Sequence, residues 1–301
     1  MAKARIIIKR RKAVRNIRKI TKVMQMIASS RYQKAYKRAM GTKPFVKKIA
    51  ELVASAVQAV RASGANIEHP LMKDPPLGLR KTALLVLTSN RGLCGGYNGN
   101  VLRMSGAKYR ELQANADQPD LYVSGKKGIS YFKFMGYPVS GSYTAIGDAP
   151  KFAEIEPLAE EFMKQYREGK ISGLKIAYMR FISAGQQRPV VIDVLPLAGL
   201  AGGAEAGAEP GADKGAVQYD FTPEPQALLE ELIPTTVKIA IFQAFIEAAV
   251  SEQIARMVAM KAATDNAEKL GKKLTQDYNR ARQSQITSEL AELMGGVEAL
   301  K

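Results

Sequence analysis

One long stretch near the end of the chain decides the fold: Ala255-Arg-Met-Val-Ala-Met-Lys-Ala-Ala-Thr-Asp-Asn-Ala-Glu-Lys-Leu-Gly-Lys-Lys-Leu-Thr-Gln-Asp-Tyr-Asn-Arg-Ala281. No proline follows Pro234, and Gly271 is the single glycine before Gly295. A helix of about 60 residues is about 90 Å long, so it must bury one face along an equally long partner. That face is a coiled-coil-like seam of apolar residues at three-four spacing, namely Ala255, Ala259, Ala263, Ala267, Leu270, Leu274, Tyr278 and Ala281.

The start of this C-terminal helix is expected at Thr222-Pro-Glu224. A hydroxyl N-cap, a proline in the first turn and an acid near the helix N-terminus are typical of a helix start. Pro234 is expected to kink or restart the helix, because its ring clashes with the carbonyl four residues earlier. We assign the C-terminal coiled-coil helix to residues 222–301.

The long partner is expected at the other end of the chain, in residues 1–61. Two apolar stripes at three-four spacing follow each other there: Ile17, Ile20, Met24, Ile27, Arg31 and Ala35, and then Ile49, Leu52, Val53, Ala56, Val57 and Val60. Gly41 to Pro44 is expected to kink this helix. Helices at opposite ends of a chain, joined by a folded middle, predict an antiparallel coiled coil closed by an inserted domain.

The middle of the chain, residues 75–217, has the pattern of an α/β domain. Strands are predicted at 82–88, 120–124, 174–182 and 189–194, and helices at 97–115, 126–135 and 151–169. This order predicts a mostly parallel, Rossmann-like sheet with an antiparallel edge. Residues 199–215 are rich in Ala, Gly and Glu, and we expect a disordered surface loop there.

Positive charge is concentrated at the start of the chain. Residues 1–48 contain 17 Lys or Arg and no acid, which equals the net charge of +17, while the rest carries 28 basic and 28 acidic residues. Such a basic stripe indicates nucleic acid, an anionic membrane surface or an acidic protein partner. The alternative is a solvated helix face, which the complete absence of acids disfavours.

Composition excludes several kinds of site. The single cysteine, Cys94, allows no internal disulfide and fits a reducing compartment. One cysteine and one histidine, His69, exclude the common zinc sites, so we expect no metal and no cofactor. No run approaches about 20 apolar residues, so we expect neither a membrane span nor a secretory signal.

The turn after the first predicted strand, Ser89-Asn-Arg-Gly-Leu-Cys-Gly-Gly-Tyr-Asn98, occupies the position of a dinucleotide loop. Its glycine spacing matches neither the dinucleotide fingerprint nor the Walker loop. We interpret it as a tight backbone turn with close helix packing. Because the acidic residues are scattered too, the sequence offers no catalytic constellation. The alternatives to a mechanical or binding part are a nucleotide-binding α/β enzyme and a basic coiled-coil nucleic-acid-binding protein.

Four segments resemble the gamma subunits of F-type ATP synthases. They are Ile17-Arg-Lys-Ile-Thr-Lys-Val-Met-Gln-Met-Ile-Ala28, Asn90-Arg-Gly-Leu-Cys-Gly-Gly-Tyr-Asn98, Ser251-Glu-Gln-Ile-Ala-Arg-Met-Val-Ala-Met-Lys-Ala-Ala-Thr-Asp-Asn-Ala267 and Tyr278-Asn-Arg-Ala-Arg-Gln-Ser-Gln-Ile-Thr-Ser-Glu-Leu290. The resemblance covers essentially the whole chain in the right order.

The resemblance implies the role of a central rotor shaft. Ion flow through the membrane c-ring would turn the shaft inside the ring of three alpha and three beta subunits, where ATP is made on beta. The implied partners are alpha, beta, epsilon and the c-ring, with no nucleic acid and no small-molecule substrate. The implied location is the cytoplasmic face of the bacterial plasma (inner) membrane, as a peripheral protein.

The resemblance also implies site residues. Met24 matches a coupling methionine, and Arg256, Gln283 and Thr287 match positions of the C-terminal helix that contact the catalytic subunits. If Met24 lies opposite Arg256, residue 1 lies opposite residue 279, and residues beyond Arg280 have no partner helix of their own chain. We expect other chains to bury the apolar stripe that continues there, which consists of Ile286, Leu290, Leu293 and Val297.

Overall fold

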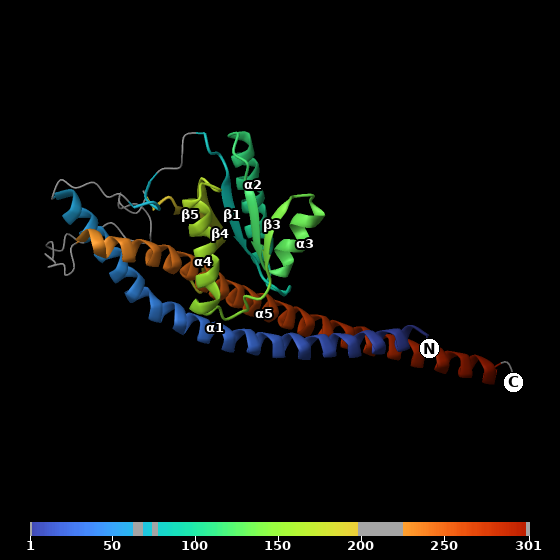
Figure 1. Ribbon diagram of the computed structural model, residues 1–301. Coiled ribbons are helices and arrows are strands. Elements are labelled where there is room, and N and C mark those ends of the chain that lie inside the picture. The colour runs from blue at the N-terminus through green and yellow to red at the C-terminus, as the bar shows by residue number, and fades with distance from the viewer. Residues whose placement is uncertain (1, 63–68, 74–77, 198–224, 299–301) are drawn as a thin grey trace. The chain divides into compact units, whose positions relative to one another are not determined.

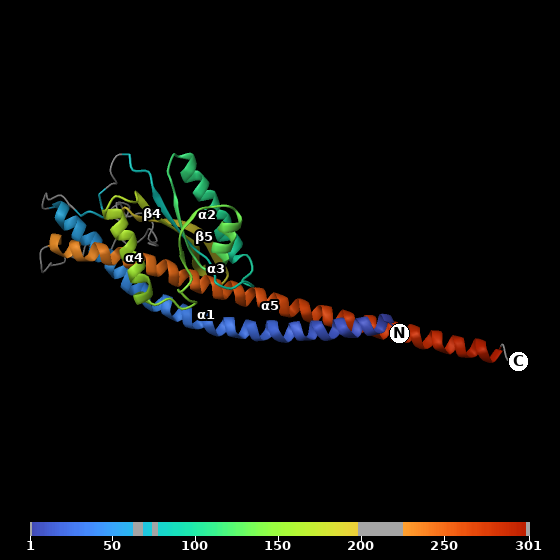
Figure 2. The ribbon, with the colours of Figure 1, turned by 45° about the vertical axis from the view of Figure 1, so that its right-hand side comes forward.

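The computed structural model describes residues 2–62, 69–73, 78–197 and 225–298. The chain divides into two units. We call Met1–Ser30, Leu93–Gly95 and Ala255–Lys301 the helical unit, and Arg31–Gly92 with Gly96–Ile254 the α/β unit. The two long helices, α1 (Ala2–Ala62) and α5 (Pro225–Glu298), contribute residues to both units (Figure 1). Figures 1 and 2 show them side by side and antiparallel, as predicted.

Helix α5 is continuous through Pro234, so the helix does not restart there. The neighbours Ile233 and Val237 are almost fully buried. Their packing keeps the helix intact although Pro234 has no N–H and one helical hydrogen bond is missing. The first described residue of α5 is Pro225, and the predicted start at residues 222–224 lies outside the described residues. The predicted loop at 199–215 lies outside them as well.

The α/β unit contains a five-stranded sheet in the order β3-β2-β1-β4-β5. Its strands are β1 (Thr82–Leu87), β2 (Asp120–Ser124), β3 (Val139–Tyr143), β4 (Gly173–Ser183) and β5 (Gln186–Leu195). The pairs β1–β2, β1–β4 and β2–β3 are parallel, whereas β4–β5 is antiparallel. The mostly parallel sheet with an antiparallel edge is therefore confirmed. The connecting helices also lie where predicted, as α2 (Tyr97–Ala114), α3 (Lys126–Phe134) and α4 (Phe152–Arg167).

The sequence analysis missed strand β3 at the edge of the sheet. Its sequence, Val-Ser-Gly-Ser-Tyr, is short, and no residue of it is fully buried, so it carries little of the hydrophobic pattern of a strand. Gly141 is required there because a Cβ would lie 2.5 Å from the ring of Tyr122 on β2. The glycine that weakens the strand pattern is thus the residue that lets the edge strand pair.

The core of the α/β unit lies where the sheet meets α4, α5 and the end of α1. All six residues of β1 are buried, as expected for a strand covered on both faces. Phe162 of α4, Ile241 of α5 and Val57 of α1 belong to one cluster with Leu85 and its alternate neighbours on β1. The predicted second stripe of α1 is confirmed, because Ala56, Val57 and Val60 are buried.

In the helical unit, the seam between α1 and α5 differs from the predicted one. The buried residues on α1 are Val14, Thr21 and Ala28, whereas the predicted Ile17, Ile20 and Ile27 are about half exposed. On α5, Ala267 is buried as predicted, but Leu270 is 47% exposed and Gly271 faces α1 instead. The smaller side chains thus lie between the two helices. A Cβ on Gly271 would lie 3.9 Å from Val14 Cγ1, so the helices approach closely there.

The register of the pair also differs from the predicted one. Thr264 hydrogen-bonds Thr21 at 2.9 Å, and Arg18 pairs with Glu268 at 3.0 Å. The partner of Met24 therefore lies near Lys261, about one helical turn beyond the predicted Arg256. The end of the self-paired part of α5 moves accordingly from Arg280 to about Gln285.

The last part of α5 is exposed within the chain. Every residue from Ile286 to Gly296 is exposed, including Leu290, Leu293 and Met294. The side chain of Val297 lies outside the described residues. An unburied apolar stripe at the end of α5, beginning at Ile286, therefore agrees with the expectation.

Over the described residues, one helix, Gln226–Gly296, is long and apolar enough to cross a membrane by length and composition alone. The sequence analysis expected no such segment. More than half of its most apolar window is buried inside the protein. Its apolar residues Ile241, Ala244 and Phe245 pack in the core of the α/β unit, which accounts for this hydrophobicity.

Candidate functional site

The turn from Ser89 to Asn98 is a braced backbone turn, as predicted. Ser89 N–H donates to Asn98 Oδ1 at 3.0 Å, and Asn98 Nδ2 donates to Ser89 Oγ at 2.7 Å. Gly95 has a positive φ of 56°, and a Cβ there would lie 3.7 Å from Ala259 Cβ. Leu93 to Gly95 belong to the helical unit, where this glycine lets the turn pack on α5.

The N-terminus of α3 lies where a parallel α/β sheet would bind a phosphate, but its amides already have acceptors. Lys126 N–H donates to Asn90 Oδ1, Lys127 N–H to the Ser89 carbonyl and Gly128 N–H to Thr88 Oγ1, over 2.9–3.1 Å. A Cβ on Gly125 would lie 2.1 Å from the Thr88 carbonyl. A nucleotide phosphate would have to displace these contacts, which weighs against the nucleotide-binding alternative.

The chain's potential nucleophile and base occupy separate units. Cys94 is a buried cysteine of the helical unit that forms no disulfide. In the α/β unit, His69 Nδ1 accepts a hydrogen bond from Leu71 N–H at 3.2 Å, and burial lowers the His69 pKa. This contact is local to the turn that holds His69. Over the described ranges, no three His, Cys, Asp or Glu side chains gather in a way that could hold a metal ion.

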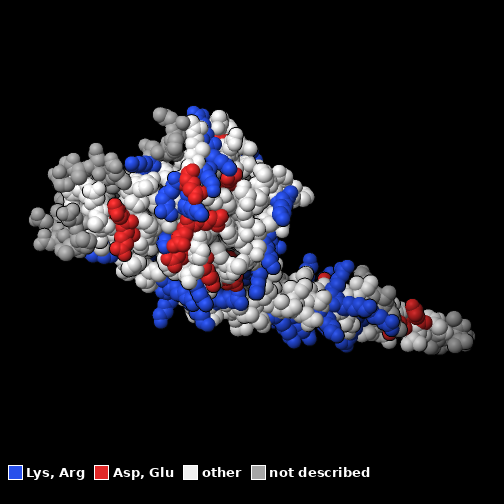
Figure 3. Space-filling model, in the orientation of Figure 1, with Lys and Arg blue, Asp and Glu red and all other residues white. Residues whose placement is uncertain are grey.

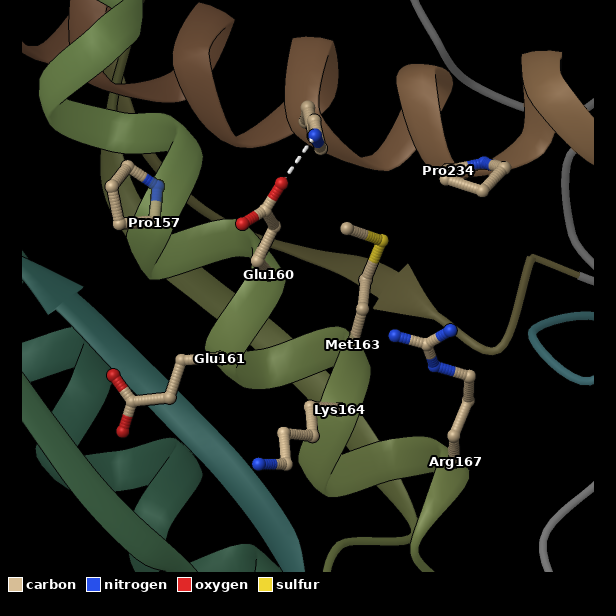
Figure 4. Close-up of a pocket in the computed structure, with 8 residues that line it drawn as sticks. Pro157, Glu160, Glu161, Met163, Lys164, Arg167 and Pro234 are labelled. Atoms are coloured by element: carbon tan, nitrogen blue, oxygen red, sulfur yellow. Dashed lines mark hydrogen bonds and ion pairs between the residues drawn. The ribbon is translucent and has the colours of Figure 1, made fainter.

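A cleft of about 510 Å³ lies between α4 and the first turns of α5 (Figure 4). It is lined by Pro157, Glu160, Glu161, Met163, Lys164, Arg167, Pro234 and Lys238. Lys238 Nζ donates to Glu160 at 2.7 Å and to Glu156 at 2.8 Å, and these hydrogen bonds raise the Lys238 pKa. Because these charges pair across α4 and α5, we interpret the cleft as a structural junction between the two helices.

The four predicted site residues lie in the helical unit, in different environments. Met24 is half-buried, and Arg256 is only 7% exposed. Gln283 and Thr287 are exposed one turn apart on α5, and Thr287 Oγ1 donates to the Gln283 carbonyl at 3.0 Å. The structure thus brings Gln283 and Thr287 together, but it does not place Met24 opposite Arg256.

The helical unit carries an exposed apolar stripe, and the sequence analysis assigned three of its four residues, Ile17, Ile20 and Ile27, to the seam. Ile17, Ile20, Val23 and Ile27 are each about half exposed on α1. The sequence contained a sign of this stripe. The first part of α1 has more apolar residues than a single contact with α5 can bury. We call these four residues the outer stripe. Contiguous exposed apolar side chains mark a surface that other molecules cover.

Basic side chains surround the outer stripe. Exposed cations on this part of α1 include Lys9, Arg10, Lys12, Arg15, Lys19 and Lys22. Others contact α5: Arg18 pairs with Glu268, and the Arg11 guanidinium lies 5.1 Å from the centre of the Tyr278 ring. Figure 3 shows the blue side chains along the surface of α1.

These observations define a class of protein: a chain whose long N- and C-terminal helices flank a central mixed sheet, with exposed apolar and cationic side chains on the N-terminal helix. Comparison with known proteins gives the particular family. The protein family described as ATP synthase matches residues 3–300.

Among curated proteins, the ATP synthase gamma chain of Rhodopirellula baltica is 42% identical over 301 residues, which is all of both chains. That of Leptospira biflexa is 38% identical over 300 residues, again with both chains fully covered. The chain therefore belongs to the ATP synthase gamma chain family.

A solved structure, the rotor of the Euglena gracilis mitochondrial ATP synthase, aligns with a TM-score of 0.64 at 17% identity. The alignment covers 95% of this chain and 99% of that one, and it shows that the fold is shared. As a gamma chain, the protein is the central rotor shaft of an ATP synthase, a membrane-associated complex.

Proposed function

We propose that this shaft couples ion flow through a c-ring to ATP synthesis and hydrolysis on the beta subunits of an alpha3beta3 ring, and that it contributes no catalytic group. The observation that carries the proposal is the outer stripe. Four apolar side chains and the cations around them lie exposed on a helix whose own seam is already filled. An enclosing ring of other subunits supplies the apolar contacts and carboxylates that such a surface needs.

The proposed partners are alpha, beta and c subunits, with epsilon beside the α/β unit. Neither cofactor, metal, nucleic acid nor small-molecule substrate takes part. The proposed location is the cytoplasmic face of the bacterial inner membrane. The functional divisions are the coiled-coil helices at 1–61 and 222–301 and the inserted domain at 75–217. The strand order β3-β2-β1-β4 supports the view that this domain is a Rossmann-like derivative that has lost its phosphate site.

Two kinds of contact to the stator are proposed for the site residues. Gln283 and Thr287 are exposed, so they touch the surrounding subunits directly. Met24 is half-buried at the border between the seam and the outer stripe, so it both packs in the shaft and meets the ring. Arg256 is buried, and we assign it a positioning role within the shaft. The exposed cations suit a bearing, because single exposed ion pairs are worth only about 0–1 kcal/mol and hold no fixed position.

The outer stripe gives the direct test. Ile17→Asp with Ile20→Asp should leave the free chain folded, because both side chains are exposed in it. The double variant should fail to co-purify with alpha, beta, epsilon and c subunits in mild detergent. Ile182→Asp, at a similarly exposed isoleucine of the α/β unit, is the matched control and should still assemble. Full assembly of the double variant would contradict the proposal, and so would ATP hydrolysis by the pure chain without beta.

A further inference from the structure

The end of strand β4 contacts both long helices within the α/β unit. Phe181 of β4 is buried in a small cluster with three residues of these helices, namely Ala39 of α1 and Ile246 and Val250 of α5. The Phe181 ring also packs edge to face on the Tyr36 ring of α1, with their centres 5.8 Å apart. The buried residues of this cluster are distinct from those of the main core of the unit.

A chain of polar contacts connects the same three elements. The Tyr178 hydroxyl of β4 donates to Glu247 Oε2 of α5 at 3.2 Å, and Gln243 Nε2 donates to Glu247 Oε1 at 3.0 Å. Thr42 Oγ1 of α1 lies 3.4 Å from Gln243 Oε1, so the chain reaches α1 as well. We call these polar contacts, together with the cluster around Phe181, the β4 junction.

The bond between Tyr178 and Glu247 is the part of the junction that joins the sheet to α5. Tyr178 is only 3% exposed, and its burial and the Glu247 carboxylate raise the pKa of Tyr178 to about 12. The hydroxyl group therefore keeps its proton at neutral pH and remains the donor. Hydrogen bonds to an ionised acceptor are roughly twice as strong as those between neutral groups.

The β4 junction lies close to the boundary of the α/β unit. Along the chain this boundary falls before Arg31 on α1 and after Ile254 on α5. Only about 10 Å of helix separates Glu247 from Ile254. Another polar contact that holds α5, between Lys238 and α4, lies about 24 Å of helix from Ile254. Of these two contacts, the β4 junction is therefore the one nearer to the point where α5 leaves the unit.

Direction distinguishes this bond from the apolar contacts around it. Burial of apolar surface is non-directional, so it resists separation of the sheet from the helices more than a small rotation of one against the other. A hydrogen bond weakens steeply when donor and acceptor turn out of line. The bond between Tyr178 and Glu247 therefore resists rotation of α5 against β4.

We propose that Tyr178 and Glu247 are positioning residues of the rotor, which transmit torque between the α/β unit and α5 where this helix leaves the unit. The inference rests on the proposed function, in which the chain carries rotation from a c-ring to an alpha3beta3 ring. Without the bond, torque twists a longer stretch of α5 inside the unit. The rotor then becomes more compliant, although its fold is unchanged.

The test measures the torsional stiffness of the assembled complex. The alpha3beta3 ring is fixed to a surface, and a gold rod is attached through Arg110→Cys, at an exposed position of α2. In a pause without ATP, the variance of the rod angle is inversely proportional to the stiffness. Tyr178→Phe removes the hydroxyl group and keeps the ring. It should raise the variance by up to about two-fold, because the stretch of α5 before the nearer polar contact grows from about 10 to about 24 Å.

Tyr122→Phe is the matched control. Tyr122 is also buried, and its hydroxyl donates to Gln165 Oε1 at 3.2 Å, the same length as the bond between Tyr178 and Glu247. This bond joins β2 to α4 and not to a long helix. Tyr122→Phe should therefore lower the thermal midpoint about as much as Tyr178→Phe does, yet leave the variance unchanged.

Two variants of Glu247 test the same bond from the side of α5. Glu247→Gln keeps an oxygen that accepts from the Tyr178 hydroxyl, so the variance should stay near that of the unsubstituted complex. Glu247→Leu removes the acceptor and should raise the variance as Tyr178→Phe does.

An unchanged variance in Tyr178→Phe would overturn the proposal. An equal increase in Tyr122→Phe, or the same variance in Glu247→Gln and Glu247→Leu, would overturn it too. The proposed function is judged separately, by whether the unsubstituted complex rotates when ATP is added. A complex that rotates but shows no effect of Tyr178→Phe overturns the role of the β4 junction and leaves the rotor role intact.

Discussion

Thr264 of α5 and Thr21 of α1 form a buried hydrogen bond between hydroxyl oxygens 2.9 Å apart. Thr21 Oγ1 in turn donates to the carbonyl of Arg18 at 3.1 Å. A polar pair inside a mostly apolar seam is best satisfied in one alignment, because sliding one helix leaves both hydroxyl groups buried without this contact. The pair therefore fixes the register of the helical unit.

We expect the two threonines to be strongly coupled in stability. Thr264→Val alone should destabilise the chain by about 1 kcal/mol, because Thr21 Oγ1 loses its hydrogen bond from Thr264 while it keeps the Arg18 carbonyl as an acceptor. The double variant Thr21→Val with Thr264→Val should recover much of this loss, since valine has a similar shape and no polar group to satisfy. Denaturant unfolding of the four proteins of the cycle measures the coupling. Additive losses in the double variant would show that the hydroxyl pair does not set the register.

The corrected register changes the expected behaviour of the end of α5. In the free chain, amide exchange should be fast from about Gln285 onward, because a lone helix of this length is marginal in water. Exchange should be slower below this point, where α1 covers α5, and assembly should protect the end of the helix. Hydrogen exchange with mass spectrometry resolves this boundary. Slow exchange from Ile286 to Gly296 in the free chain would contradict both the register and the need for enclosing subunits.

The elements of this fold could be predicted because their signals are local. The buried run of β1, the helices between the strands and the two long helices follow from hydrophobic period and from proline and glycine positions. Strand β3 could not be predicted, because Gly141 is explained by the Tyr122 ring of a neighbouring strand and not by its own segment. The five residues of β3 have little strand pattern of their own, and their hydrogen-bonded pairing with β2 makes them a strand.

The face and register of the helix pair could not be predicted for a different reason. On α1, two rows of residues compatible with a helical seam lie side by side, one with Val14, Thr21 and Ala28 and the other with Ile17, Ile20 and Ile27. Spacing alone does not tell which stripe meets α5. Steric fit decides, because small residues and Gly271 let the two backbones approach. The larger isoleucines therefore face outward. These apolar residues, which the helix pair does not bury, form the candidate contact surface.

Met24 tests the proposed coupling surface. Met24→Lys should leave the shaft folded, because a half-buried lysine can extend its charged end to water. Inside the ring it adds a cation at the border of the outer stripe, so proton pumping per ATP hydrolysed should fall several-fold while hydrolysis continues. Pumping and hydrolysis are measured together in membrane vesicles. Met24→Leu keeps size and polarity and should retain normal coupling. An unchanged ratio in Met24→Lys would remove Met24 from the coupling surface.

His69 gives the α/β unit a dependence on pH. Burial lowers the His69 pKa, with Arg167 acting in the same direction and Glu230 against it. The neutral ring is therefore favoured in the folded state. Its contribution to stability is present above the ordinary histidine pKa of about 6.5 and is lost as the pH falls through the lower folded value.

His69→Asn should reduce this loss. The Asn side-chain oxygen can accept the Leu71 N–H in place of Nδ1, but it does not titrate. The thermal midpoint of the unsubstituted chain should therefore fall more between pH 7.5 and about 5.5 than that of the variant. All other groups are shared, so the difference between the two falls reports His69 alone. Equal falls would show that His69 binds its proton equally well in the folded and unfolded chains, and a larger fall in the variant would reverse the sign of the argument.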